Sequence, residues 1–374
     1  MDWHYIQPVN IHFGNGMLSC LAEEIHKIDG KRGILVTSSS FVENGLVKRL
    51  CHENPKTITT IFSEVSPNTD INECDTCSSL IRKNKCDFVI ALGGGSVIDC
   101  AKAAAVFCLD NIPTQAYFEG TAPLPAKKLP LIAIPTTAGT GSEVTRVTVL
   151  MDHSKGIKAP LKAPVFYPTT AIVDPELTYT LPKYMTACTG MDALCHAIEA
   201  YWNINHHPIS DALAFHAANL AVKYLEQACF EPHSPIAREK MAEASLTAGM
   251  AFTLTGTTSV HACSYPLGSL LDIPHGEACG LTIDRFMKIN AEADQNGRLK
   301  RLARAMGFND VETVADAITE LKFRIGLKND LTSFNLTDGQ IEQLVKGSQH
   351  SNLKNNPVPI TADTLRSVYR SMVI

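Results

Sequence analysis

FVIALGGGSVIDCAKAAAV, residues 88–106, combines a short apolar run, three glycines and a small-residue helical pattern in that order. Phe88–Leu92 is typical of a strand that is buried on both faces. Glycines at a strand-to-helix turn let backbone amides approach a ligand, and the N-terminus of the next helix offers unpaired N–H groups. A tight turn would need only one glycine, so Gly93-Gly94-Gly95-Ser96 favours a pyrophosphate cradle. Its spacing is neither GxGxxG nor a Walker loop, so the nucleotide stays open.

Similar β-rich runs alternate with helical stretches on both sides of this segment, which predicts a parallel sheet covered by helices. The runs are Gly33–Thr37, Thr59–Phe62, Leu131–Ile134 and Ala171–Val173. Val9–Phe13 alternates with a period of two and is predicted to be an edge strand. After Leu181-Pro182 the pattern becomes helical, with helix starts at Ser234-Pro235 and at the capping box Thr337 to Gln340. The sequence therefore predicts an α/β dinucleotide-binding domain over 1–180, with a Rossmann-like parallel sheet, and an all-helical metal-binding domain over 181–374.

Composition excludes several classes of protein. A chain of 374 residues with 45% hydrophobic residues can form two cores, and a net charge of −5 without a basic block argues against nucleic acid as a partner. The N-terminus has no secretory pattern and no segment has the length of a membrane span, so a soluble cytoplasmic protein is expected. The twelve cysteines are scattered and predicted to be reduced. The single CxxC, Cys74 to Cys77, is interpreted as helix residues in preference to a redox or zinc motif.

A second polar loop, Pro135–Glu143, follows the strand Leu131–Ile134. Ligands of open α/β sheets bind at the carboxyl ends of strands, so the two loops are predicted to enclose one cofactor.

Four side chains in the second half form a candidate metal site. Asp192 and His196 are spaced i, i+4 in a helical pattern, which places a carboxylate and an imidazole on one face. His261 and His275 follow about 65 residues later. A lone histidine is more often a packed or surface residue, but three nitrogens and one carboxylate together suit Fe(II), Zn(II), Co(II) or Mn(II). Cys195 and Cys263 lie nearby in sequence and are interpreted as small core residues.

Four segments in series resemble the iron-containing, group III alcohol dehydrogenases: GGGSxxDxAK (93–102), PTTAGTGSEVT (135–145), GMDALxHAIEA (190–200) and VHxxxxPLG with PHGxA (260–278). The resemblance extends over nearly the whole chain. It implies an N-terminal dinucleotide-binding domain, a C-terminal helical metal domain and an active site in the cleft between them. The implied activity is metal-dependent hydride transfer between NAD(P)(H) and a small alcohol or aldehyde, with aldehyde reduction the expected direction.

The resemblance also assigns roles to individual residues. The metal ligands are Asp192, His196, His261 and His275. Phe252 is a wall of the substrate pocket. The cofactor-binding residues are Gly93, Gly94, Gly95, Ser96, Asp99, Thr136, Thr137, Thr140, Thr145 and Lys158. A homodimer or a higher homo-oligomer is expected.

Two positions depart from the family's commonest pattern. Tyr265 stands where many members have a fifth histidine near the substrate, so the proton route is open. Tyr265 is expected to act as a pocket wall or orienting hydrogen-bond donor, with the proton passing through metal-bound water and the ribose hydroxyls. Ser38 stands where NAD-preferring members have an acidic residue for the ribose, so NADP is a candidate cofactor beside NAD. Two other functions are alternatives: a dehydroquinate-synthase-like metal- and NAD-dependent lyase or cyclase, and a non-catalytic nucleotide sensor. The DxxxH spacing argues against the first, and the complete ligand set against the second. The sequence does not identify the substrate, and it does not place Arg146 or Lys162 inside or outside the pocket.

Overall fold

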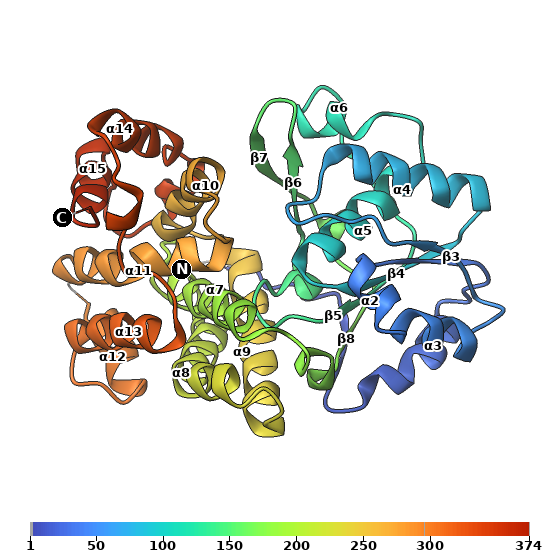
Figure 1. The fold of residues 1–374 in the computed structure, drawn as a ribbon, viewed down its shortest axis with the longest axis horizontal. Helices are drawn as coiled ribbons and strands as arrows, with labels where there is room; N and C mark the ends of the chain where they lie inside the picture. Colours follow the sequence, from blue (N-terminus) through green and yellow to red (C-terminus); the bar gives the residue numbers. More distant parts are fainter. Residues whose placement is uncertain (1–2, 295, 374) are drawn as a thin grey trace. The chain divides into compact units, whose positions relative to one another are not determined.

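The computed structural model describes residues 3–294 and 296–373, which divide into two compact units. The α/β unit comprises residues 6–137 and 142–178. The helical unit comprises residues 3–5, 138–141, 179–294 and 296–373. Figure 1 shows the first unit mainly in blue and green and the second mainly in yellow-green to red. This architecture confirms the predicted fold class.

The α/β unit is built on a six-stranded sheet with the order β1-β8-β5-β4-β2-β3, in which every neighbouring pair is parallel. Each predicted strand is present, and the segment near residue 10 is an edge strand as predicted. The strands are β1 (Asn10–Phe13), β2 (Gly33–Val36), β3 (Ile58–Phe62), β4 (Phe88–Gly93), β5 (Leu131–Pro135) and β8 (Thr170–Val173). β4 is central and completely buried, which explains its uninterrupted apolar sequence.

Both faces of the sheet are covered by helices. Successive side chains of a strand point to opposite faces, so they pack in two separate hydrophobic cores. Val89 and Ala91 pack in one core with α4 and α5, whereas Ile90 and Leu92 pack in the other with α1 and α3. The helices of this unit are α1 (Leu21–Lys27), α2 (Ser39–Glu43), α3 (Leu46–Glu53), α4 (Ile71–Asn84), α5 (Gly95–Phe107) and α6 (Thr114–Phe118), with 3-10 turns η1 (Met17–Cys20), η2 (Ser142–Val144), η3 (Pro164–Phe166) and η4 (Pro175–Thr178). Cys74 and Cys77 are buried residues of α4, and all twelve cysteines are free thiols.

An antiparallel hairpin between β6 (Val147–Asp152) and β7 (Ile157–Lys162) was not predicted. β6 alternates between buried and half-buried residues, but β7 has no such alternation and contains Pro160 and two lysines. A proline within a strand masks its β character, since proline cannot donate to the ladder.

The helical unit is arranged around α7 (Lys183–Trp202), which contacts α8, α9 and α11. The predicted helix starts are confirmed: the Ser234 hydroxyl accepts the Ala237 amide, and Thr337 and Gln340 form a capping box. No helix in the described residues has the length and apolar character needed to cross a membrane. The remaining helices are α8 (Pro208–Phe230), α9 (Pro235–Thr255), α10 (Ser259–Leu271), α11 (His275–Glu292), α12 (Arg298–Ala305), α13 (Val311–Ile325), α14 (Asp338–Gly347) and α15 (Ala362–Arg370), with 3-10 turns η5 (Thr332–Phe334) and η6 (Ser351–Asn355).

Candidate metal and nucleotide sites

The four side chains of the predicted metal site come together around one carboxylate oxygen in the helical unit. Asp192 Oδ1 lies 3.7 Å from His196 Nδ1, 3.4 Å from His261 Nε2 and 3.6 Å from His275 Nε2. Asp192 and His196 lie one turn apart on α7, as their spacing predicts. The other two histidines come from α10 and from the first residue of α11.

Gly276 explains how α11 brings His275 so close to α7. A Cβ atom at this position would lie 1.8 Å from the carbonyl oxygen of Cys188 on α7. Only glycine therefore permits this approach of the two backbones. A larger residue would move His275 away from Asp192.

The polar atoms of this cluster have the environment expected of metal ligands. Asp192 Oδ1, His196 Nδ1 and His261 Nε2 are buried and lack a hydrogen-bond partner among the described residues. Such groups are rare, because each costs about 1–3 kcal/mol when nothing satisfies it. Burial raises the pKa of Asp192, but the imidazoles of His196, His275 and His261 outweigh it and hold the pKa well below its usual range. Burial lowers the pKa of His196 to about 4, which keeps its ring neutral and able to donate a lone pair. The cluster therefore fits a divalent cation.

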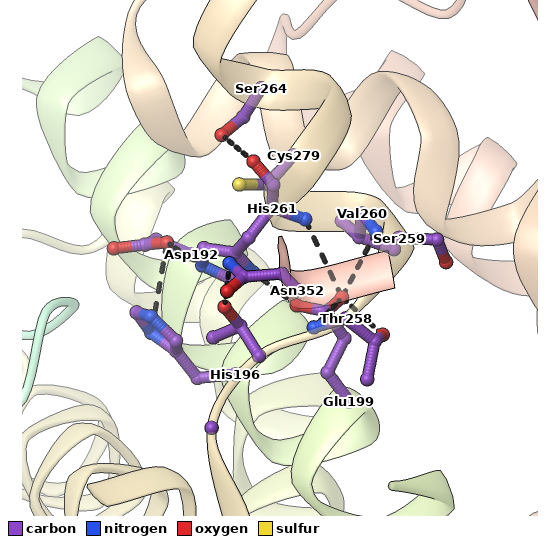
Figure 2. Close-up of polar contacts among 12 residues, drawn as sticks. Asp192, His196, Glu199, Thr258, Ser259, Val260, His261, Ser264, Cys279 and Asn352 are labelled. Carbon is purple, nitrogen blue, oxygen red and sulfur yellow. Dashed lines mark hydrogen bonds and ion pairs between the residues drawn. The ribbon is translucent and has the colours of Figure 1, made fainter. Parts of the chain in front are cut away.

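Glu199 orients His261 from the side opposite Asp192 and was missed by the sequence analysis (Figure 2). Its Oε2 bonds His261 Nδ1, while its Oε1 accepts the amides of Thr258 at 2.9 Å and Val260 at 3.0 Å. These amides are at the N-terminus of α10, where no side chain of the helix itself provides a cap. Burial raises the pKa of Glu199, but His261 and Thr258 outweigh it and lower the pKa. A carboxylate behind a ligating imidazole fixes the tautomer that leaves Nε2 free for a metal.

A cysteine that the sequence analysis did not consider lies in the same cluster. The ligand atoms of Cys279, Asp192, His261 and His275 all lie within 4.8 Å of one another. Cys195 and Cys263 are completely buried and are not members of this group.

Phe252, predicted to be a wall of the pocket, and Tyr265 each lie beside a histidine ring. The Phe252 ring on α9 stacks on His196 with 4.1 Å between ring centroids. Tyr265, one turn after His261 on α10, has its ring 5.0 Å from that of His350, which lies far away in sequence. Burial raises the pKa of Tyr265. Their roles toward a substrate stay predictions.

The residues that begin the two polar loops predicted to enclose a cofactor are neighbours in the α/β unit. The Thr136 amide donates to the Gly93 carbonyl at 3.1 Å, and a Cβ at Gly94 would lie 3.3 Å from the Thr137 methyl group. α5 begins at Gly95 without a side-chain cap. Its first amides are therefore suited to an anionic ligand such as a pyrophosphate.

Asp99 and Thr145, both predicted to bind the cofactor, belong to a buried polar network around Lys102. Lys102 Nζ donates to Ser142 Oγ at 2.8 Å and to Thr145 Oγ1 at 3.1 Å, and Ser142 Oγ donates to Asp99 at 2.7 Å. Burial lowers the pKa of Lys102 to about 8, although Asp99 and Glu143 oppose this change. The network holds the second loop against α5. Thr140 lies in segment 138–141, which groups with the helical unit.

The remaining predicted cofactor residues are Ser38, which follows β2, and Lys158, which lies near the start of β7. The Ser38 hydroxyl contacts that of Ser40 at 2.9 Å. Asn68 connects two predicted residues, because its amide donates to Ser96 Oγ at 3.2 Å and its Oδ1 accepts from Lys158 Nζ at 2.8 Å. Asn68 was missed, although its place in a Ser-Pro-Asn loop after a strand was an available signal.

The basic residues that the sequence left unplaced lie at the β6–β7 hairpin. Lys162 is the last residue of β7, and Arg146 directly precedes β6. Burial and then the charge of Arg146 lower the pKa of Lys162.

Comparison with known proteins matches both halves of the chain to one family. Residues 8–175 match the family described as "Iron-containing alcohol dehydrogenase", and residues 186–373 match "Fe-containing alcohol dehydrogenase family, C-terminal". Alcohol dehydrogenase 4 of Schizosaccharomyces pombe is 33% identical, with 98% of this chain and 88% of that protein covered. The 1,3-propanediol dehydrogenase of Klebsiella pneumoniae is 31% identical over 98% of this chain and 97% of its own.

A solved structure gives a higher identity. Sulfoacetaldehyde reductase from Bifidobacterium kashiwanohense, in complex with NAD+, is 50% identical with a TM-score of 0.97, covering 100% of this chain and 99% of its own.

Proposed function

This chain belongs to the iron-containing alcohol dehydrogenase family of oxidoreductases, and on that premise we propose that it reduces a small anionic aldehyde with a nicotinamide nucleotide and a divalent metal. We assign the metal to Asp192, His196, His261 and His275. The observation that carries this assignment is the convergence of buried, unpartnered donor atoms on Asp192 Oδ1. A metal bound there would act as a Lewis acid on the substrate oxygen.

The residues around the proposed ligands have positioning roles. Glu199 holds His261 in the tautomer with Nε2 free, so no rearrangement is needed when the metal binds. Phe252 covers one face of the His196 ring and keeps water from it. Tyr265 is a hydrogen-bond donor with a raised pKa, which makes it a poor proton carrier near neutral pH.

We propose that the nucleotide binds at the carboxyl ends of β4 and β5, with its pyrophosphate on Gly93–Ser96 and the N-terminus of α5. The nucleotide would supply the hydride. The uncapped helix start and the close approach of Gly94 and Thr137 support this placement. Ser38 offers no carboxylate to repel a 2′-phosphate, so NADPH is proposed as a cofactor beside NADH.

The proposed substrate class rests on the similarity to sulfoacetaldehyde reductase, which at 50% identity exceeds the 31% identity to 1,3-propanediol dehydrogenase. An aldehyde with a sulfonate group is therefore the first candidate, and a neutral hydroxyaldehyde is the second. No observation favours the lyase or the nucleotide sensor.

The experiment removes metal with a chelator, restores Fe(II), Zn(II), Mn(II) or Co(II) singly, and follows NADH and NADPH oxidation spectrophotometrically. Sulfoacetaldehyde, 3-hydroxypropanal and propanal are compared by kcat/KM. Asp192→Ala and His275→Ala should abolish hydride transfer and leave nucleotide affinity within a few-fold. Full activity in either variant, when shown by metal analysis to be metal-free, would refute the ligand assignment. Preference for propanal over sulfoacetaldehyde would refute the substrate class.

A further inference from the structure

Cys279 occupies a position from which it can reach the proposed metal. It lies one turn after His275 on the same face of α11 and is completely buried. Its Sγ and the ligand atoms of Asp192, His261 and His275 lie within 4.8 Å of one another. Figure 2 shows its sulfur close to His261 and Asp192.

A second observation points to a ligand in this cluster. Asp192 Oδ1 and His261 Nε2 are buried, have no hydrogen-bond partner among the described residues, and belong to the same group of four as Cys279. One cation would satisfy both atoms and would lie within reach of the sulfur. The thiol is therefore part of a cluster of donors and not an isolated cysteine.

Cys263, another buried thiol of the helical unit, is not a member of this group of four ligand atoms. Cys263 is on α10, two residues after His261, but its neighbours are Tyr369 and Ser348. It is as deeply buried as Cys279 and serves as a matched control.

We propose that Cys279 is a sulfur ligand of the metal, alongside the histidines and Asp192, and that it biases the site toward thiophilic ions such as Zn(II) and Co(II) over Mn(II). This inference rests on the proposed function, because it concerns the same metal. Carboxylate and imidazole donors accept several divalent ions, whereas thiolate sulfur favours the softer ones. When the metal–sulfur bond forms, the thiol proton leaves to solvent, so binding releases one proton more than nitrogen and oxygen ligation would.

The test loads the metal-free full-length protein with one equivalent of Co(II) and records its absorption spectrum. The proposal expects an intense sulfur-to-cobalt charge-transfer band in the near ultraviolet, present in the wild type and in Cys263→Ser but absent in Cys279→Ser. Competition with a chelator should show that Cys279→Ser lowers the affinity for Zn(II) at least about tenfold more than the affinity for Mn(II).

X-ray absorption of the Zn(II)-loaded wild type decides the question if Cys279→Ser does not fold. A sulfur shell near about 2.3 Å, beside nitrogen and oxygen near about 2.0–2.1 Å, supports the proposal. A wild type that binds Co(II) stoichiometrically without the band, or Zn(II) without the sulfur shell, overturns it and leaves the proposed function standing. A wild type that binds neither ion overturns both.

Discussion

Replacement of Glu199 by glutamine is expected to weaken metal binding, although Glu199 is not among the proposed ligands. The carboxylate has two functions at once: Oε2 bonds His261 Nδ1, and Oε1 accepts the amides of Thr258 and Val260. Glutamine has the same shape but can present an oxygen on only one side. One of these two functions must therefore be lost.

The contacts show which interaction is lost in each orientation of the glutamine. If the glutamine NH₂ faces His261, then Nδ1 must accept and the ring proton moves to Nε2, the atom directed at Asp192. Loss of a carboxylate that holds a metal-ligating imidazole typically costs about 10–100-fold in metal affinity, or roughly 1.4–2.7 kcal/mol. If the NH₂ faces α10 instead, two buried amides lose their acceptor at about 1–3 kcal/mol each, which lowers the free energy of unfolding.

The assay measures Zn(II) affinity by chelator competition and the stability of the metal-free protein by urea unfolding. Asp284→Asn is the matched control, because Asp284 is also a buried carboxylate of the helical unit and pairs with Lys322 at 3.1 Å, away from the histidines. The control should lose stability and keep its metal affinity. If folded Glu199→Gln retains both wild-type metal affinity and wild-type stability, the reasoning is refuted.

Three further predictions concern other residues. Wild-type kcat/KM with NADPH should lie within about a hundredfold, or about 2.7 kcal/mol, of the value with NADH. Ser38→Asp should shift the preference toward NADH. Stronger rejection of NADPH by the wild type would contradict this prediction. Tyr265→Phe should lower kcat/KM by about tenfold or less, because only one hydrogen bond is lost. A loss of about 10²–10⁴-fold, with one limb missing from the pH–rate profile, would instead identify Tyr265 as the acid. Burial raises the pKa of Glu143 from 4.5 to about 7. The folded protein therefore holds a proton that the unfolded chain loses, so the contribution of Glu143 to the free energy of unfolding is full below pH 4.5 and is lost as pH rises through 7. Urea unfolding of Glu143→Gln should therefore show a flatter profile over this range, by up to roughly 3 kcal/mol, and identical profiles would refute the assignment.

Local sequence patterns predicted much of the fold. The six parallel strands appear in the sequence as short apolar or β-rich runs. A buried strand is made of consecutive residues, so its apolar side chains lie next to one another in the sequence. Asp192 and His196 were placed on one helix face by their spacing alone, and the geometry of α7 brings them together as expected. The β6–β7 hairpin was missed because Pro160 and the lysines of β7 conceal its strand character.

The residues that hold the predicted site residues in place come from distant parts of the chain. Glu199 is 62 residues from His261, and Asn68 is 90 residues from Lys158, so no local period connects either pair. Cys279 resembled any buried thiol in sequence, and only the packing of α11 against α7, made possible by Gly276, brings it to Asp192. Periodicity determines which face of an element a residue occupies, because it follows from backbone geometry. Which side chain lies opposite is decided by the packing of whole elements, and that packing exists only in the folded chain.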